Sequence, residues 1–175
     1  MNHFKKIELL ANIAIITVAI LLGAVLVKRY VLTDDGNNPA IEQVAAGSKV
    51  SLPGVDWAKN GQTLLLVLSE GCRYCTQSAG FYQRLMRESA SGGNARLVAV
   101  LPQETEVARK YLNGLGVAID DVRQASPLSV GTKGTPTLIL VNSSGVVTDA
   151  WMGQLTPDEE SKVLARLQPP AVSSR

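Results

Sequence analysis

The two cysteines of this chain stand three residues apart, in the run Cys72-Arg73-Tyr74-Cys75. Side chains with this spacing at the start of a helix share one face, with Cβ atoms about 5–6 Å apart. A disulfide needs Cα atoms about 4.4–6.8 Å apart, so the pair can open and close with little backbone movement. The sequence has no third cysteine, which excludes a framework of structural disulfides. The spacing therefore predicts one reversible disulfide.

The two sulfurs are expected to lie in different environments. Cys72 is predicted at a helix N-terminus, where unpaired N–H groups and the helix dipole favour a thiolate. Arg73 adds a fixed positive charge beside it. Cys75 lies one turn further along and is expected to be shielded. The pattern predicts an exposed attacking thiol and a buried resolving thiol. The modest stabilisation of the thiolate favours a reductase or isomerase over a strong oxidant.

Other chemistries fit this cysteine pair less well and remain alternatives. A zinc ribbon needs a second ligand pair, and the only histidine is His3. Copper delivery would usually want a histidine in the same domain. A peroxidase motif has Pro and Thr seven and three residues before its cysteine, where this chain has Leu65 and Ser69. A permanent, inert disulfide would close too short a loop to stabilise the fold much. We therefore predict no metal and no cofactor.

The length and composition of the chain limit the classes of protein that could carry this site. The chain has 175 residues, of which 46% are hydrophobic and 18% charged, so it can bury a core and is not globally disordered. Its length suits one domain with an additional segment. The formal net charge of +2 gives no electrostatic footprint for nucleic acid.

The segments around the cysteines predict a mixed sheet with helices packed on it. Apolar runs at residues 63–68 and 95–101 are typical of strands buried on both faces. A helix is expected from Cys72 to about residue 89, and a second at 104–115 with Val107, Tyr111 and Leu115 on its buried stripe. Residues 50–55 are expected to form a short strand or hairpin.

The C-terminal half continues this pattern. Ser126 and Pro127 are suited to open a short helical turn. Residues 137–142 and 146–152 predict a hairpin. Thr156, followed by proline and acidic residues, predicts the start of a helix that ends near residue 167. The expected order is β-α-β-α followed by β-β-α, an α/β arrangement.

The N-terminal part predicts a membrane anchor. Residues 9–27 are uncharged, and as a helix they would span roughly 28 Å, about the thickness of a bilayer core. A buried core helix is seldom so apolar, and a cleaved signal peptide fits poorly because Lys28 and Arg29 follow directly. Lys5 and Lys6 precede the span, so the charge balance only slightly favours an inside N-terminus.

These features predict four parts of the chain. Residues 1–32 are the N-terminal tail and transmembrane anchor, and 33–47 a flexible linker. Residues 48–168 form the folded domain, and 169–175 a disordered tail. We expect a single-pass protein of the cytoplasmic membrane whose C-terminal domain faces the periplasm or the cell exterior.

A strand at 64–68, a Cys-x-x-Cys motif opening a helix, and Gly134-Thr135-Pro136-Thr137 before a hairpin together resemble the thioredoxin superfamily. The resemblance covers roughly residues 48–167. Extra length between residues 98 and 119 looks like the central insertion of the membrane-tethered TlpA and ResA-like branch. The resemblance implies a thioredoxin-like fold, with Pro136 as a cis proline facing the disulfide and Thr135 offering backbone groups to a substrate.

The same resemblance implies an enzyme, a thiol–disulfide oxidoreductase with Cys72 and Cys75 as catalytic residues. We predict that Arg73, Tyr74, Thr135 and Pro136 contact the substrate. The partners would be protein disulfides or dithiols and a membrane electron donor or acceptor. The main alternative is a redox-inactive interaction module that uses the same fold.

The sequence also departs from the thioredoxin pattern at two positions. Gly71 stands where a tryptophan commonly precedes the first cysteine, and Leu66 stands where thioredoxins have a buried acid. That acid assists proton transfer to and from the buried cysteine. Trp57, Trp151 and Met152 are expected to be packing residues.

Overall fold

The computed structural model describes residues 13, 15–18, 20, 22, 44–59, 61–92 and 94–168. The chain divides into two compact units, Met1–Ala40 and Ile41–Arg175. Within the predicted span at residues 9–27, residues 13, 15–18, 20 and 22 are helical, and the others lie outside the described residues. The tail at 169–175 and most of the linker at 33–47 lie outside them too. Among the described residues, no helix has both the length and the apolar character needed to cross a membrane.

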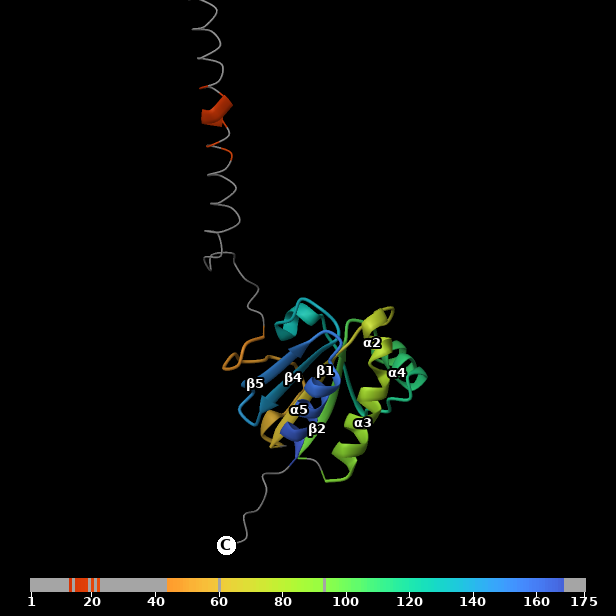
Figure 1. Cartoon of the computed structure of the whole chain (residues 1–175). Helices are drawn as coiled ribbons and strands as arrows, with labels where there is room; N and C mark the ends of the chain where they lie inside the picture. Colours follow the sequence, from red (N-terminus) through yellow and green to blue (C-terminus); the bar gives the residue numbers. More distant parts are fainter. Residues whose placement is uncertain are drawn as a thin grey trace, which may run out of the picture. The chain divides into compact units, whose positions relative to one another are not determined.

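The second unit is built on a five-stranded mixed sheet with the order β3-β2-β1-β4-β5. Figure 1 shows β5, β4, β1 and β2 side by side. β1 pairs in parallel with β2, which pairs in parallel with β3, whereas β4 runs antiparallel to both β1 and β5. The strands are β1 (Gln62–Val67), β2 (Ala95–Leu101), β3 (Asp121–Gln124), β4 (Thr137–Asn142) and β5 (Val147–Met152).

The α-helices of this unit pack on one face of the sheet. Their buried side chains join those of alternate strand residues in a single core, which we call the helical core. Leu64, Leu66 and Leu68 contribute to it from β1 and its end, and Leu85 of α3 is fully buried there. The helices are α2 (Arg73–Gln77), α3 (Ala79–Ala90), α4 (Thr105–Gly114) and α5 (Pro157–Leu167).

The opposite face of the sheet is covered without an α-helix in the described residues. Leu65, Val67 and Ile139 point to this side and are fully buried. The segment 44–59, which ends in the 3-10 helix η1 (Trp57–Lys59), and a second 3-10 helix η2 (Pro127–Val130) pack over them. We call this second cluster the aliphatic core. β1 is thus buried on both faces, as its continuous apolar run predicts.

Several predicted local signals are confirmed. Ser126 caps η2 by accepting from the Leu128 N–H, with Pro127 at its first turn. Thr156 begins α5 with a complete capping box that includes Glu159. β4 and β5 form the predicted hairpin, although a register shift lies between Leu140 and Val141. These signals are local, so the sequence alone is sufficient to specify them.

The predicted helix from Cys72 to about residue 89 is instead two helices that meet at Ser78. Ser78 has φ −88° and ψ 4°, outside the regular helical range, and it ends α2 and begins α3. Serine and glycine have low helix propensity, and Ser78 and Gly80 lie together at this point. The apolar periodicity continues through the break, which explains why the sequence did not show it.

Three further expectations about the elements were wrong. α4 turns Ala108 and Leu112 fully to the core. Of the predicted stripe, Tyr111 and Leu115 pack against this core partly buried, but Val107 is 42% exposed. Residues 50–55, all described, form no regular strand, because Pro53 has no N–H and Gly54 takes a positive φ of 76°. β3 was not predicted because Val122 is its only apolar residue. α4 and β3 occupy the extra length between the cysteines and Pro136, and β3 adds an edge strand.

Candidate functional site

The disulfide between Cys72 and Cys75 forms at the C-terminal end of β1, where the chain turns into α2. The turn passes through Gly71, whose φ of 80° is a left-handed conformation that side chains rarely adopt. The Cys72 N–H donates to the Ser69 carbonyl at 3.2 Å, which closes the turn. The two Cα atoms are 5.2 Å apart, within the expected range for a pair that opens and closes.

The two sulfurs differ in environment as the sequence predicted. Cys75 is fully buried in the helical core, whereas Cys72 is partly exposed. Cys72 is the N-cap residue of α2, and its sulfur accepts a hydrogen bond from the Cys75 N–H at 3.2 Å. This bond would strengthen if Cys72 became a thiolate. α2 has only five residues, so its dipole is weaker than that of the long helix predicted from the sequence. The direct bond from the Cys75 N–H is therefore the stronger source of stabilisation for a Cys72 thiolate.

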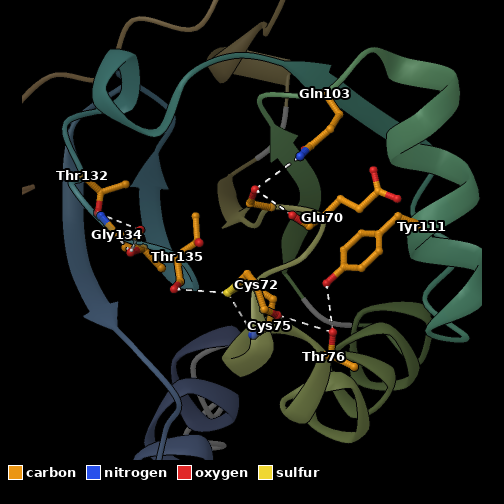
Figure 2. Close-up of a disulfide and its surroundings, with 11 residues drawn as sticks. Glu70, Cys72, Cys75, Thr76, Gln103, Tyr111, Thr132, Gly134 and Thr135 are labelled. Carbon is orange, nitrogen blue, oxygen red and sulfur yellow. Dashed lines mark hydrogen bonds between the residues drawn. A yellow bond between two sulfur atoms is a disulfide. The ribbon is translucent and has the colours of Figure 1, made fainter.

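The loop before β4 brings a backbone carbonyl to the disulfide. The Thr135 carbonyl oxygen lies 3.4 Å from the Cys72 sulfur, a contact that Figure 2 marks. The Thr135–Pro136 peptide bond is cis, which confirms the prediction made from the resemblance. The Pro136 carbonyl accepts from the Gly153 N–H at 2.8 Å, so the end of β5 holds this loop.

Two threonine hydroxyls hold the same loop in place through hydrogen bonds. Neither residue was identified from the sequence. Thr132 and Thr137 are buried, and their hydroxyl oxygens are 3.0 Å apart. The Thr137 hydroxyl donates to the Gly134 carbonyl at 2.8 Å, and the Gly134 N–H donates to the Thr132 hydroxyl at 3.4 Å. The threonines flanking the Gly-Thr-Pro run were the only sequence signal for this role.

The other predicted substrate-contacting residues lie on the surface beside the disulfide. Arg73 is exposed, and Tyr74 is 56% exposed although it is aromatic. Trp57 and Trp151 pack against the aliphatic and helical cores, as predicted. Met152 does not: it is 50% exposed, and its sulfur lies at the Gly134 loop, 3.7 Å from where a Cβ on Gly134 would be. The structure thus brings exposed apolar side chains to the site. Substrate contact by these residues stays a prediction.

The loop that leads to Cys72 has a supporting residue from β2's C-terminal end. The Gln103 side-chain amide donates to the Ser69 hydroxyl at 3.3 Å (Figure 2), and the Ser69 hydroxyl contacts the Glu70 carbonyl at 3.3 Å. Since Ser69 also accepts from the Cys72 N–H, Gln103 helps to position the first cysteine. Gln103 stands 31 positions after Cys72 in the sequence, so only the parallel pairing of β1 and β2 reveals it.

A group of hydroxyls lies behind the disulfide on the side of α4. The Thr76 hydroxyl contacts the Cys72 carbonyl at 3.4 Å and the Tyr111 hydroxyl at 3.5 Å (Figure 2). Deeper in the core, Ser78 and Tyr82 are buried, and burial raises the pKa of the Tyr82 phenol well above its usual value. Leu66 is fully buried, as expected for a leucine at this position of β1. Among the described residues, no three His, Cys, Asp or Glu side chains are grouped so that they could hold a metal ion.

The sheet order, the position of the disulfide and the facing cis proline define a thioredoxin-like fold. The sequence matches no protein-family model and no curated protein. Solved structures share the fold. One, from Chlorobium tepidum and assigned as the thiol:disulfide interchange protein DsbE, is 23% identical with a TM-score of 0.54, over 71% of this chain and 99% of that one.

Two further structures resemble this chain to a similar degree. StoA from Bacillus subtilis is 16% identical with a TM-score of 0.51, over 73% of this chain and 98% of that one. The thioredoxin domain of a thiol-disulfide oxidoreductase from Bacteroides vulgatus is 16% identical with a TM-score of 0.53, over 73% of this chain and 100% of that one. At these identities the likeness establishes the fold.

Proposed function

We propose that this protein is a thiol–disulfide oxidoreductase that exchanges disulfides with protein substrates through Cys72 and Cys75. The observation that carries the proposal is the asymmetry of the pair: Cys72 is partly exposed beneath the Thr135 carbonyl, and Cys75 is fully buried. An inert structural disulfide has no need of this arrangement. The names of the structures that share the fold, interchange protein and oxidoreductase, agree with it.

The geometry supports a two-step exchange. The Cys72 thiolate, held by the Cys75 N–H, attacks one sulfur of a substrate disulfide and releases the other as a thiolate. Cys75 then loses its proton to solvent, and its thiolate attacks the Cys72 sulfur of the mixed disulfide. The Cys72–Cys75 bond forms, the bond to the substrate breaks, and the substrate leaves as a second thiolate. The two electrons that reduce the substrate come from the cysteine pair.

The surface around Cys72 suits an extended polypeptide. Thr135 presents its backbone beside the reacting sulfur, so a substrate segment could align there as an added strand. Tyr74 and Met152 are half exposed and supply apolar contact at the disulfide and at the Gly134 loop. A partly unfolded protein, with accessible backbone and apolar side chains, fits these features better than a small disulfide does.

Trapping tests the proposal. Cys75→Ser should leave Cys72 able to attack but unable to release the substrate, so mixed disulfides should accumulate and be visible on a non-reducing gel. Cys72→Ser is the matched control and should trap nothing, because Cys75 is buried. If neither variant traps a partner and the parent does not equilibrate with glutathione, the chain is a binding module that uses this fold.

We further propose that the protein works as a reductase or isomerase on the outer side of the cytoplasmic membrane. The uncharged run at residues 9–27 supports the membrane anchor, and an electron donor in that membrane would then keep the pair reduced. A reporter active only in the cytoplasm, fused after Arg175, should stay silent. The equilibrium with glutathione should give a potential below about −180 mV, whereas a value near about −120 mV would make the protein an oxidant.

A further inference from the structure

Thr135 is the residue of the loop before β4 whose backbone groups remain available for pairing. Among the described residues its N–H has no hydrogen-bond partner, and its carbonyl faces the Cys72 sulfur at 3.4 Å. The next residue, Pro136, has no N–H, and its carbonyl already accepts from the Gly153 N–H at 2.8 Å. Facing residues of an antiparallel strand pair exchange one N–H···O bond in each direction. Thr135 can therefore form one complete pair with a residue of an extended substrate.

Two buried hydroxyls hold the residue just before Thr135. The Thr137 hydroxyl donates to the Gly134 carbonyl at 2.8 Å, which uses its only proton. The Thr132 hydroxyl can then donate to the Thr137 oxygen, 3.0 Å away, while it accepts from the Gly134 N–H at 3.4 Å (Figure 2). Its other acceptor, the Gly134 carbonyl, is farther, at 3.3 Å. Both backbone groups of Gly134 therefore depend on this pair of hydroxyls.

Thr132 is the member of the pair that lies outside the sheet. Thr137 begins β4 and is paired with Val67 of β1 and Met152 of β5, so the neighbouring strands fix its backbone. Thr132 has no strand on either side of it. Its side chain is fully buried, and a buried hydroxyl without a partner would be costly. The bond between the two hydroxyls thus ties the loop that leads to Thr135 to the fixed start of β4.

We propose that Thr132 is a positioning residue for polypeptide substrates, because its hydroxyl holds the Thr135 backbone in the orientation that pairs with a substrate strand. The proposal rests on the proposed exchange function and concerns how that site distinguishes a polypeptide disulfide from a small one. A small disulfide needs only the Cys72 sulfur, whereas a polypeptide also uses the Thr135 backbone. Loss of the Thr132 hydroxyl should therefore impair exchange with polypeptides selectively.

The test compares two substrates of the reduced full chain that release the same coloured thiolate. One is the small disulfide dithiobis(nitrobenzoate), and the other is an extended peptide whose single cysteine carries the same nitrothiobenzoate group. Stopped-flow rates against substrate concentration give a half-saturation concentration and a limiting rate. Thr132→Val keeps nearly the same shape, and it should raise the half-saturation concentration for the peptide by about three- to tenfold. The rate with the small disulfide should stay unchanged.

Two further variants test the route through the hydroxyls. Thr132→Ser keeps the hydroxyl and should restore most of the parent value for the peptide. Thr137→Val breaks the same pair of hydroxyls and should give the same selective change. The double valine variant should be little worse than either single one, because both remove one shared bond.

Thr148→Val is the matched control. The Thr148 hydroxyl also donates to a backbone carbonyl, that of Leu140 at 3.2 Å, but it lies near the start of β5, whereas the loop is held at the end of that strand. Its loss should change neither substrate. Parent values for the peptide in Thr132→Val, equal slowing of both substrates, or an equal effect of Thr148→Val would each overturn the proposal while the exchange function stands. A parent that reacts with neither substrate would reject the exchange function and this inference together.

Discussion

The two faces of the sheet are covered in different ways, although the same strands build both. One face packs against four α-helices and holds Cys75 and the aromatic Phe81 and Tyr82. The other is closed by the irregular segment 44–59 and by η2, and its buried members are aliphatic. Residues adjacent along β1, such as Leu65 and Leu66, therefore lie in separate environments. Side chains alternate between the two faces along a strand, so neighbouring residues contribute either to the core that contains Cys75 or to a purely aliphatic core.

The largest expected effect comes from placing a carboxyl group on each face. Leu66→Asp and Leu65→Asp should each destabilise the domain by about 3–5 kcal/mol, since both positions are fully buried. Burial raises the pKa of the new carboxyl above its unfolded value, so this penalty should be smallest below about pH 4 and grow as the pH rises. Urea unfolding at several pH values measures it.

The rate of disulfide release should distinguish the two aspartate variants. Leu66 shares a core with Cys75 and Leu65 does not, so only Leu66→Asp should alter the pH dependence of disulfide release. An equal change in both variants would contradict the separation of the faces.

Leucine-to-alanine substitutions test whether the segments that cover the two faces of the sheet differ in rigidity. Leu85→Ala in α3 should cost near the upper end of about 2–5 kcal/mol, because regular helices cannot collapse into the cavity. Leu52→Ala, in the irregular cover of the other face, should fall near the lower end, since that segment can relax. Denaturant midpoints at constant m-value provide the measurement. A larger loss for Leu52→Ala would show that the irregular cover is the more rigid one.

A smaller effect is expected at the start of α5, which covers the helical core. Thr156→Ala removes the cap and should destabilise the domain by about 1 kcal/mol. Hydrogen bonds from the Thr156 backbone and side chain lower the pKa of Glu159. Their stabilisation is complete above the unfolded pKa of Glu159 and is lost as the pH falls through the folded value. Thermal unfolding at neutral and acidic pH should therefore show that the variant loses less stability on acidification than the parent.

The smallest effect is expected at the β3 edge of the sheet. Asp121 pairs with Arg96 of β2 and with Arg123 of its own strand, and both arginines are partly exposed. Asp121→Asn should cost about 0.5–1 kcal/mol, and the loss should shrink in high salt. Unfolding at low and high salt measures it. A salt-independent loss would indicate that Asp121 matters for packing rather than for charge.

The sequence predicted those parts of the fold that depend on local signals. The apolar run of β1, the cap at Ser126 and the capping box at Thr156 each specify their element without help from distant residues. β3 could not be found in this way, since it is a strand only because β2 lies beside it. The break at Ser78 was hidden because the buried face continues across it.

The same distinction between local signals and contacts of distant residues applies to the site. The spacing of Cys72 and Cys75 specified the disulfide, whereas the cis bond before Pro136 came from the family resemblance. Gln103 acts through Ser69, and folding brings the two together from distant parts of the sequence, so composition and spacing gave no sign of it.

The edges of the sheet also affect the tendency of the protein to aggregate. An unprotected edge strand offers free backbone groups to another chain and promotes aggregation. Here β3 has only four residues and carries charged side chains, and the start of β5 is bonded along its outer side by residues 47–49. The short β3 and the covered start of β5 are thus poor templates for a foreign strand. A protein that handles partly unfolded partners would gain from this, because it could hold an exposed chain at Thr135 without nucleating a shared sheet.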